Sequence, residues 1–170
     1  MKKRCEWAKN EPKLTYHDNE WGWPEHNDQK LFEFLILEGA QAGLSWSTIL
    51  NRRNGYRDAF SNFDAIVVSK YTQNHIEKLL KNKNIIRNKL KINSVVNNAK
   101  KFIEIQKQFG SFDDYVWSFV NHKTMQNKFK KHSDLPSYTE LSETLSHDLK
   151  KRGFTFVGPT ICYAFMQSVG

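Results

Sequence analysis

The sequence has few cysteines and no long apolar run, and both absences restrict what the protein can be. Only Cys5 and Cys162 occur among the 170 residues. Two cysteines do not make a disulfide framework, so the cysteine content agrees with a protein that works in a reducing compartment. No apolar run approaches the length of a membrane span, and the basic start Met1–Glu6 lacks the apolar stretch of a secretory signal. We therefore expect a cytoplasmic protein without a membrane partner.

Convincing strand alternation is also absent, as are repeats and low-complexity tracts. Nearly every periodic segment has helical spacing instead, with apolar residues at i, i+3, i+4 and i+7. Good N-cap residues precede several of these segments, namely Asn27, Ser45 and Thr72. A long helix is predicted to stop at Gly110. The length suits one core, so we predict a single all-α domain over residues 1–170.

The net charge of +8 is unevenly placed along the chain. Residues 81–110 hold eight Lys or Arg side chains against one Glu, whereas residues 1–40 hold eight acidic and six basic side chains. One-sided positive charge is typical of a protein with a polyanionic partner. A solvated, lysine-rich surface explains the charge equally well. A membrane-surface role fits less well, because the basic residues are spread over several helices.

Aromatic side chains gather around one carboxylate in the first part of the chain. Glu38 falls at the i+7 position of the apolar stripe that begins at Leu31, where a carboxylate needs a partner or a pocket. Flat π-faces beside a carboxylate suit a planar, nitrogen-rich ring, such as a nucleic-acid base. Taken singly, however, such tryptophans are more often core residues, and Glu38 could be a buried ion-pair partner. Four of the five tryptophans lie in the first 46 residues: Trp7, Trp21, Trp23 and Trp46.

The C-terminal part predicts two helices joined by a short turn between glycines, at about residues 138–169. Ser137 and Glu140 form a capping-box pair for the first helix, and Pro159 suits the first position of the second. In a helix-hairpin-helix motif, glycines let the backbone approach a phosphate, and the N-terminus of the second helix adds positive charge. Spacing alone somewhat favours an ordinary helical hairpin.

Ordered blocks of residues run through essentially the whole chain. They are Arg4-Cys5 with Trp7, Tyr16–Gly22, Leu37–Gly39, Gln41–Trp46, Val116–Asn121, Lys150–Phe154 and Phe156–Thr160. Together these blocks resemble the bacterial 3-methyladenine DNA glycosylase I family of the helix-hairpin-helix superfamily. The resemblance implies base-excision repair of double-stranded DNA that contains alkylated adenine. The implied reaction hydrolyses the bond between 3-methyladenine and deoxyribose and releases the free base.

The resemblance also assigns roles to the aromatic and acidic residues, with the base pocket mainly in residues 1–60. Glu38, as the catalytic residue, and Tyr16 would hydrogen-bond the extruded base, and Trp46 would stack on it. Trp7 and Trp21 would line the pocket. The relatives carry a further tyrosine shortly before Tyr16, where this chain is one residue shorter and has no tyrosine. One pocket wall is therefore expected to differ.

Two segments are expected to contact DNA. The loop between Glu38 and Trp46 must rim the pocket, and Leu44 beside Gly43 could wedge apart unstacked bases, although it could instead pack under Trp46. The C-terminal hairpin would hold the DNA backbone without reading sequence. Its expected contact residues are Lys151, Gly153, Gly158 and Thr160.

Cys5 and His17 form half of a metal site, because a zinc site needs about four ligands. The family resemblance implies a structural zinc completed by a His and a Cys just beyond the hairpin. This sequence stops at Gly170 before they would appear, and Cys162 matches no family ligand. Either a C-terminal tail is omitted or the zinc has been lost. Without the tail, a free thiol and an ordinary histidine are expected.

Two other functions fit some of the same features. A non-catalytic module could bind damaged or single-stranded nucleic acid through its aromatics and basic face. A small-molecule hydrolase of nucleosides is a weaker alternative, because the basic helices would serve no purpose there. The leading interpretation is a monomeric, monofunctional DNA glycosylase that acts by base flipping.

Overall fold

Helices make up all the regular secondary structure in residues 4–170, which the computed structural model describes. The predicted all-α class is therefore confirmed for this part of the chain, while Met1–Lys3, at the basic start, lie outside the described residues. No helix of residues 4–170 is long and apolar enough to cross a membrane. The helices are α1 (Lys13–Asn19), α2 (Asp28–Gln41), α3 (Trp46–Leu50), α4 (Arg53–Ala59), η1 (Ser61–Phe63), α5 (Ala65–Ser69), α6 (Gln73–Leu79), α7 (Lys89–Phe109), α8 (Phe112–Ser118), η2 (His132–Asp134), α9 (Glu140–Lys151) and α10 (Pro159–Ser168), where η denotes a 3-10 helix.

Several helix ends are where the sequence predicts them. Asn27 and Ser45 precede α2 and α3, and each side chain accepts a hydrogen bond from the backbone N–H three residues on. Thr72 precedes α6 and forms a capping box. Gly110 ends α7 with φ +93°, a conformation that glycine adopts without steric cost.

The start of α9 differs from the prediction. Its N-cap is Thr139 rather than Ser137, and Glu140 is the first residue of the helix. Thr139 accepts a hydrogen bond from the Ser142 N–H, and the Ser142 hydroxyl accepts one from the Thr139 N–H. Ser142 thus does what Glu or Gln usually does at the third position of a capping box. Its short side chain is completely buried, which a glutamate there could not be without a partner.

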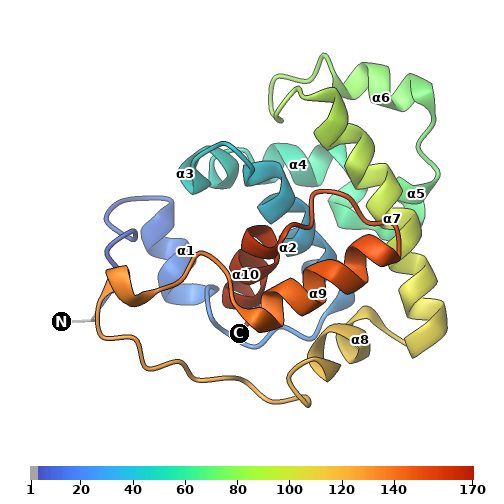
Figure 1. Cartoon of the computed structure of the whole chain (residues 1–170). Coiled ribbons are helices and arrows are strands. Elements are labelled where there is room, and N and C mark those ends of the chain that lie inside the picture. Colours follow the sequence, from blue (N-terminus) through green and yellow to red (C-terminus); the bar gives the residue numbers. More distant parts are fainter. Residues whose placement is uncertain (1–3) are drawn as a thin grey trace.

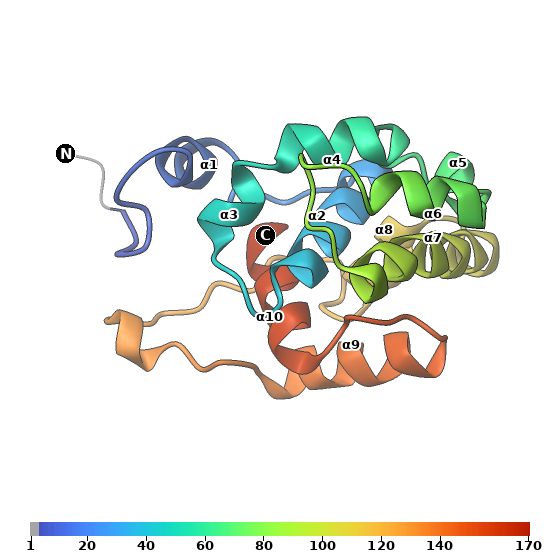
Figure 2. The same cartoon turned by 90° about the horizontal axis from the view of Figure 1, so that it is seen from above.

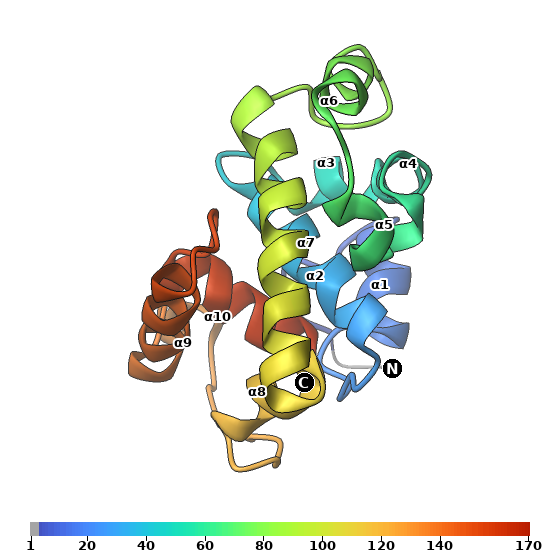
Figure 3. The same ribbon diagram turned by 90° about the vertical axis from the view of Figure 1, so that its right-hand side faces the viewer.

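Helix α2 is the centre of the molecule. Residues 31–40 are all buried, because α7 packs on one side of α2 and α10 on another (Figures 1 and 3). A surface helix would have a solvated stripe, whereas α2 has almost none. Any polar side chain among residues 31–40 must therefore find its partner inside the protein.

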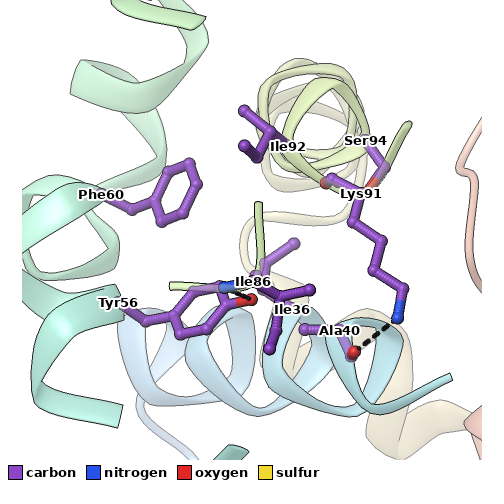
Figure 4. A pocket seen from close by; sticks show the side chains of 8 residues that line it. All are labelled: Ile36, Ala40, Tyr56, Phe60, Ile86, Lys91, Ile92 and Ser94. Carbon is purple, nitrogen blue, oxygen red and sulfur yellow. Dashed lines mark hydrogen bonds between the residues drawn. The ribbon is translucent and has the colours of Figure 1, made fainter. Parts of the chain in front are cut away.

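Lys91 ties the C-terminal end of α2 to α7. Its ammonium donates to the carbonyl oxygen of Ala40 at 2.9 Å, drawn in Figure 4, and to that of Ala42 at 2.6 Å. The last carbonyls of a helix have no partner within the helix, so this contact satisfies two of them. Burial lowers the pKa of Lys91. A cavity of only about 10 Å³ remains between Lys91 and Tyr56, so side chains fill this region.

A long connection joins α8 to α9 along the outside of the molecule (Figures 1 and 2). The polar segment 121–137 within it has no regular secondary structure apart from the short η2. The chain then returns through α9 to α10, which brings the C-terminal helix back onto α2.

Candidate functional site

Glu38 lies on α2 with 4% of its surface exposed. Its carboxylate oxygen Oε1 accepts a hydrogen bond of 2.6 Å from the Ser168 hydroxyl. No Lys, Arg or His of residues 4–170 forms an ion pair with it. Burial raises the pKa of Glu38 to about 7, and the hydrogen bond from Ser168 opposes this rise. The carboxyl therefore changes charge near neutral pH, as groups at functional sites often do.

Tyr16 and Trp46 form an aromatic wall beside this carboxyl. Tyr16 is buried in α1, and its hydroxyl donates to Ser168 Oγ at 3.0 Å. Trp46 is the first residue of α3, and its ring centroid lies 5.5 Å from that of Tyr16 with the planes at 57°. Because Trp46 is only half-buried, part of its ring remains accessible for stacking. The fold therefore brings together the three residues predicted to hold the base.

Trp7 and Trp21 extend this wall. Their ring centroids are 5.3 Å apart in an edge-to-face arrangement, and Trp7 lies 6.2 Å from the Tyr16 ring. Trp21 also stacks on His17 at 5.6 Å. Both tryptophans are half-buried and pack against the core. Their position agrees with a lining role, but they contact the Tyr16 side of the site rather than Glu38.

Arg53 braces the other side of the aromatic wall, and sequence reasoning did not single it out. Its guanidinium pairs with Glu33 at 2.7 Å and with Glu20 at 2.8 Å. It also lies 5.3 Å from the ring centroid of Phe34, which contacts Tyr16. This network joins α2 and α4 to the residue that follows α1. Its positive charge is used within the network and does not neutralise the carboxyl of the site.

The loop between α2 and α3 leads from Glu38 to Trp46 and is open at its tip. Gly43 has φ +76°, and no atom lies within 4 Å of the position a Cβ would take. Leu44 beside it is 40% exposed. This exposure favours the predicted wedge over the alternative that Leu44 is packed under Trp46. Lys91 holds the start of the loop through the Ala42 carbonyl.

Two asparagines of α7 hold the turn between α9 and α10. Asn98 is 2% exposed and makes two hydrogen bonds with the Thr155 backbone, at 2.8 and 3.0 Å. Asn97 donates to the Gly153 carbonyl at 2.8 Å. Within the turn, Gly153 has φ +93° and Phe156 has φ +55°. The hairpin is thus a fixed structure, in which the predicted Gly153 is needed for its backbone conformation.

The outer side of this hairpin carries the predicted DNA contacts. Lys151, Gly153 and Thr160 are exposed. Gly158 is the N-cap of α10 with φ −64°, and a Cβ added there would meet no atom within 4 Å. Its N–H has no protein acceptor among residues 4–170. Such N–H groups at a helix start are suited to a phosphate.

Arg152 differs from its neighbours Lys150 and Lys151. It pairs with Asp148 at 2.6 Å and donates to the Gln108 side chain at 2.7 Å. Its guanidinium also lies over the ring of Phe109 at 5.0 Å. Arg152 therefore fixes the end of α9, and the two exposed lysines supply the accessible charge.

The hairpin and the base site meet at Gly39, the residue after Glu38. A Cβ at Gly39 would lie 3.2 Å from the Phe156 carbonyl oxygen and 3.3 Å from the Phe156 Cβ. Only a glycine allows this close approach without displacement of the turn. The hairpin therefore has a defined position relative to the carboxyl.

A cavity of about 590 Å³, larger than the one beside Lys91, lies between α8, the connection that follows α8, and α10. Nothing in the sequence pointed to it. It is lined by Trp117, Tyr163, Met166 and others, and of the predicted pocket residues only Trp21 reaches it. It is therefore distinct from the site at Glu38.

Cys5 and His17 are neighbours in the fold, through the Cys5 backbone rather than through its thiol. The Cys5 backbone N–H donates to His17 Nε2 at 3.3 Å, and His17 Nδ1 lies 3.0 Å from Asp18. Within residues 4–170, no group of three or more His, Cys, Asp and Glu side chains could hold a metal ion. Cys162 is buried far along the chain in α10, where its thiol contacts the Val157 carbonyl. The residues present therefore do not make a complete zinc site.

Ser168 is the site residue that sequence reasoning missed. It stands in the last turn of α10, four residues after Ala164 and three after Phe165, on the face that packs into the core. A serine at the i+7 position of the stripe Ile161, Ala164 and Phe165 is the signal that could have revealed it.

Comparison with known proteins identifies the family of the chain. The family model described as methyladenine glycosylase matches residues 7–170. The chain belongs to the methyladenine glycosylase family. DNA-3-methyladenine glycosylase of Haemophilus influenzae is 47% identical over 171 residues, which cover 100% of this chain and 92% of that protein.

Solved structures of glycosylases of this kind have the same fold. A crystal structure of 3-methyladenine DNA glycosylase I aligns with a TM-score of 0.96 and 44% identity, covering 99% of this chain and 93% of that one. A tyrosine variant of 3-methyladenine DNA glycosylase I in complex with 3-methyladenine aligns with a TM-score of 0.95 and 34% identity, covering 98% of this chain and 90% of that one. The predicted family and fold are confirmed.

Proposed function

We propose that this chain excises 3-methyladenine from DNA as a monofunctional glycosylase, with the base flipped into the site at Glu38. Family membership makes its activity that of a DNA-3-methyladenine glycosylase in base-excision repair. The observation that carries the choice of site is the buried, uncompensated carboxyl of Glu38 beside Tyr16 and Trp46. The complex of a related glycosylase with 3-methyladenine supports the same ligand.

The chemistry of the substrate explains why these residue types suffice. Alkylation at N3 gives the base a positive charge, which weakens its bond to the sugar. When that bond breaks, the base takes the electron pair and leaves neutral, and water adds hydroxide to the sugar carbon while its proton goes to solvent. Little acid catalysis is needed, so recognition of the cationic base is the main task. An ionised Glu38 attracts the cation and accepts its N–H donors, and the face of Trp46 favours positive charge.

A base that is stacked inside the DNA duplex cannot reach this site, so the damaged nucleotide must first turn out of the duplex. The loop with Gly43 and Leu44 leads into the site, and Leu44 is exposed there. The hairpin residues Lys151, Gly153, Gly158 and Thr160 would hold the backbone of the damaged duplex. Both the rim loop and the hairpin are fixed to α7, by Lys91 and Asn98 respectively. Such a frame lets the protein hold the strand while one nucleotide turns out.

The experiment that tests this function is chromatography of the bases released from methylated DNA. We expect free 3-methyladenine and strands that remain uncut. Binding without release would support the binding module instead. A lyase would form a Schiff base through a lysine, and Lys13, half-buried at the start of α1 and three residues before Tyr16, is a candidate for that role. Borohydride should therefore trap no covalent protein–DNA adduct, and a trapped adduct would contradict the monofunctional assignment.

Leu44→Ala is expected to slow excision from duplex DNA by about tenfold, because holding unstacked bases apart costs a few kcal/mol per step. Excision from single-stranded DNA should change little, since that substrate has fewer stacked pairs to separate. Leu135→Ala is the matched control, because Leu135 has similar exposure, 37% against 40%. Single-turnover rates on both substrates measure the effect. Equal losses on single and double strands would argue against a wedge.

Lys151→Ala is expected to lower affinity for all DNA sequences alike and to flatten the salt dependence by roughly one unit of slope. Lys151 is exposed in the last turn of α9 and has no ion-pair partner within residues 4–170. Lys70→Ala removes an exposed lysine outside the hairpin and serves as the control. Titrations of labelled duplex at several salt concentrations give both slopes. An unchanged slope for Lys151→Ala would remove this residue from the interface.

A further inference from the structure

Ser168 touches both hydrogen-bonding residues of the base site. Its Oγ lies 2.6 Å from Glu38 Oε1, 3.0 Å from the Tyr16 hydroxyl and 3.0 Å from the carbonyl oxygen of Ala164. The exposed fractions of Ser168, Glu38 and Tyr16 are 2%, 4% and 3%. Three separate helices, α1, α2 and α10, therefore meet at one hydroxyl.

The hydrogens at this junction can be assigned from what each group is able to donate. Tyr16 keeps its proton at neutral pH and donates to Ser168. Ser168 has one hydrogen, with Glu38 and the Ala164 carbonyl as possible acceptors. An ionised carboxylate is the stronger acceptor, and 2.6 Å is typical of a hydroxyl that donates to one. If Glu38 is protonated, it can donate to Ser168, whose hydrogen then turns to Ala164.

In the part of the chain that the structure describes, no charged group near Glu38 compensates its negative charge, so the hydrogen bond from the Ser168 hydroxyl is the main interaction that stabilises the ionised carboxylate. Tyr16, on α1, faces it as a neutral group. Arg53, on α4, is paired with Glu33 on α2 and with Glu20, so its charge is compensated there. From α10 only the Ser168 hydroxyl faces the carboxyl. Within residues 4–170, Glu38 therefore depends on hydrogen bonding rather than on a cation to be ionised in the free protein.

We propose that Ser168 is a positioning residue of the base site, which orients the Glu38 carboxylate and favours its ionised form. The inference rests on the proposed function, since it assigns Ser168 to the site at which the alkylated base would bind. Ser168 also links the site to DNA binding, because α10 begins at the hairpin and ends at this hydroxyl. A helix of 10 residues spans about 15 Å, so one rigid element joins the two.

The proposal predicts how the charge of Glu38 responds to a change at position 168. Ser168→Ala removes the donor to Glu38 and the acceptor of Tyr16. The midpoint of Glu38 ionisation should rise by about one to two pH units, the equivalent of one hydrogen bond to a charged group. At pH 7 less of the protein would then hold an ionised carboxylate. Affinity for free 3-methyladenine at that pH should fall about tenfold or more.

The test is a carbon-13 NMR titration of the Glu38 carboxyl, followed by binding of 3-methyladenine. Ser146→Ala is the matched control, because Ser146 is also a buried serine and donates only to the Val157 carbonyl, at 2.6 Å. The control should lose stability but keep the wild-type midpoint. If Ser168→Ala does not fold, Ser168→Cys fills the same space with a weaker donor and should raise the midpoint by a smaller amount.

The outcomes separate this inference from the proposed function. A folded Ser168→Ala or Ser168→Cys with the wild-type midpoint and affinity would overturn the positioning role, whatever the enzyme does to DNA. Wild-type protein that releases no base from methylated DNA would instead refute the proposed function, while the NMR titration would still report on Ser168. A raised midpoint together with weaker binding supports both.

Discussion

At pH 8, Glu38→Gln will have an affinity for 3-methyladenine and a rate of excision from DNA that are each about ten- to a hundredfold lower than those of wild type. The amide keeps the shape of the side chain but removes the charge from a desolvated hydrogen bond, a loss on the order of 1.5–3 kcal/mol. Affinity for undamaged duplex should be unchanged, because the hairpin and basic side chains provide it. Single-turnover excision and duplex titration measure the two quantities. Glu104→Gln, at an exposed carboxylate of α7, is the control.

The same substitution should stabilise the fold at high pH. The pKa of Glu38 is about 7 in the folded protein and 4.5 for an ordinary glutamate. The folded protein thus binds more protons than the unfolded chain between these values, and this contribution to stability is lost as the pH rises through that window. Glutamine does not titrate, so the variant should gain up to roughly 3 kcal/mol on wild type above pH 7. Denaturant unfolding at pH 5 and pH 8 measures this difference.

Wild-type excision by Glu38→Gln would mean that Glu38 serves only the structure. A stability gain without loss of activity would show instead that the charge of Glu38 is needed neither for recognition nor for folding. Loss of both activity and stability would indicate that the carboxyl supports the fold through Ser168 and that its charge has no separate role in recognition.

Gly158→Val will weaken DNA binding by about ten- to a hundredfold and leave free 3-methyladenine binding intact. The Gly158 N–H has no protein acceptor within the described chain, and a hydrogen bond to a charged phosphate is worth 1.5–3 kcal/mol. A β-branched side chain beside this N–H would keep the phosphate away. The backbone at Gly158 has φ −64° and open space around the Cβ position, so valine fits the free protein without strain. Duplex and free-base titrations measure the two affinities.

Gly158→Ala separates bulk from helix capping. Alanine and valine are both poor N-cap residues, so both variants should lose similar stability, about 1 kcal/mol. Their DNA affinities should differ, with alanine closer to wild type. If valine and alanine behave alike, or if either abolishes free-base binding, close approach of phosphate to Gly158 is not the reason.

Local signals predicted much of this fold. Asn27 and Ser45 cap helices because their side chains accept hydrogen bonds from N–H groups three residues away, and such contacts depend only on nearby sequence. The predicted start of α9 was wrong for a related reason. Ser137 and Thr139 can both cap, and the choice depends on Ser142 being buried by the rest of the protein. Burial of that kind is a tertiary property.

The residues of the site also fall into two groups, those that the sequence indicated and those that only the fold reveals. The stripe on α2 showed that Glu38 needs a partner or a pocket, and the resemblance to known glycosylases named Tyr16 and Trp46 beside it. The partner itself, Ser168, is 130 residues away, and no spacing rule connects the two. Asn98, which holds the hairpin from α7, was hidden for the same reason. Contacts between distant segments require the fold, although the serine at the end of the apolar stripe of α10 was a visible hint.

The most direct test of the central claim is a crystal structure of this protein with 3-methyladenine. The base should lie against Trp46, with an N–H group within hydrogen-bond distance of the Glu38 carboxylate and the Tyr16 hydroxyl nearby. The cavity of about 590 Å³ between α8 and α10 offers a contrasting location in the same molecule. A base bound in that cavity, away from Glu38, would contradict the assignment of the site.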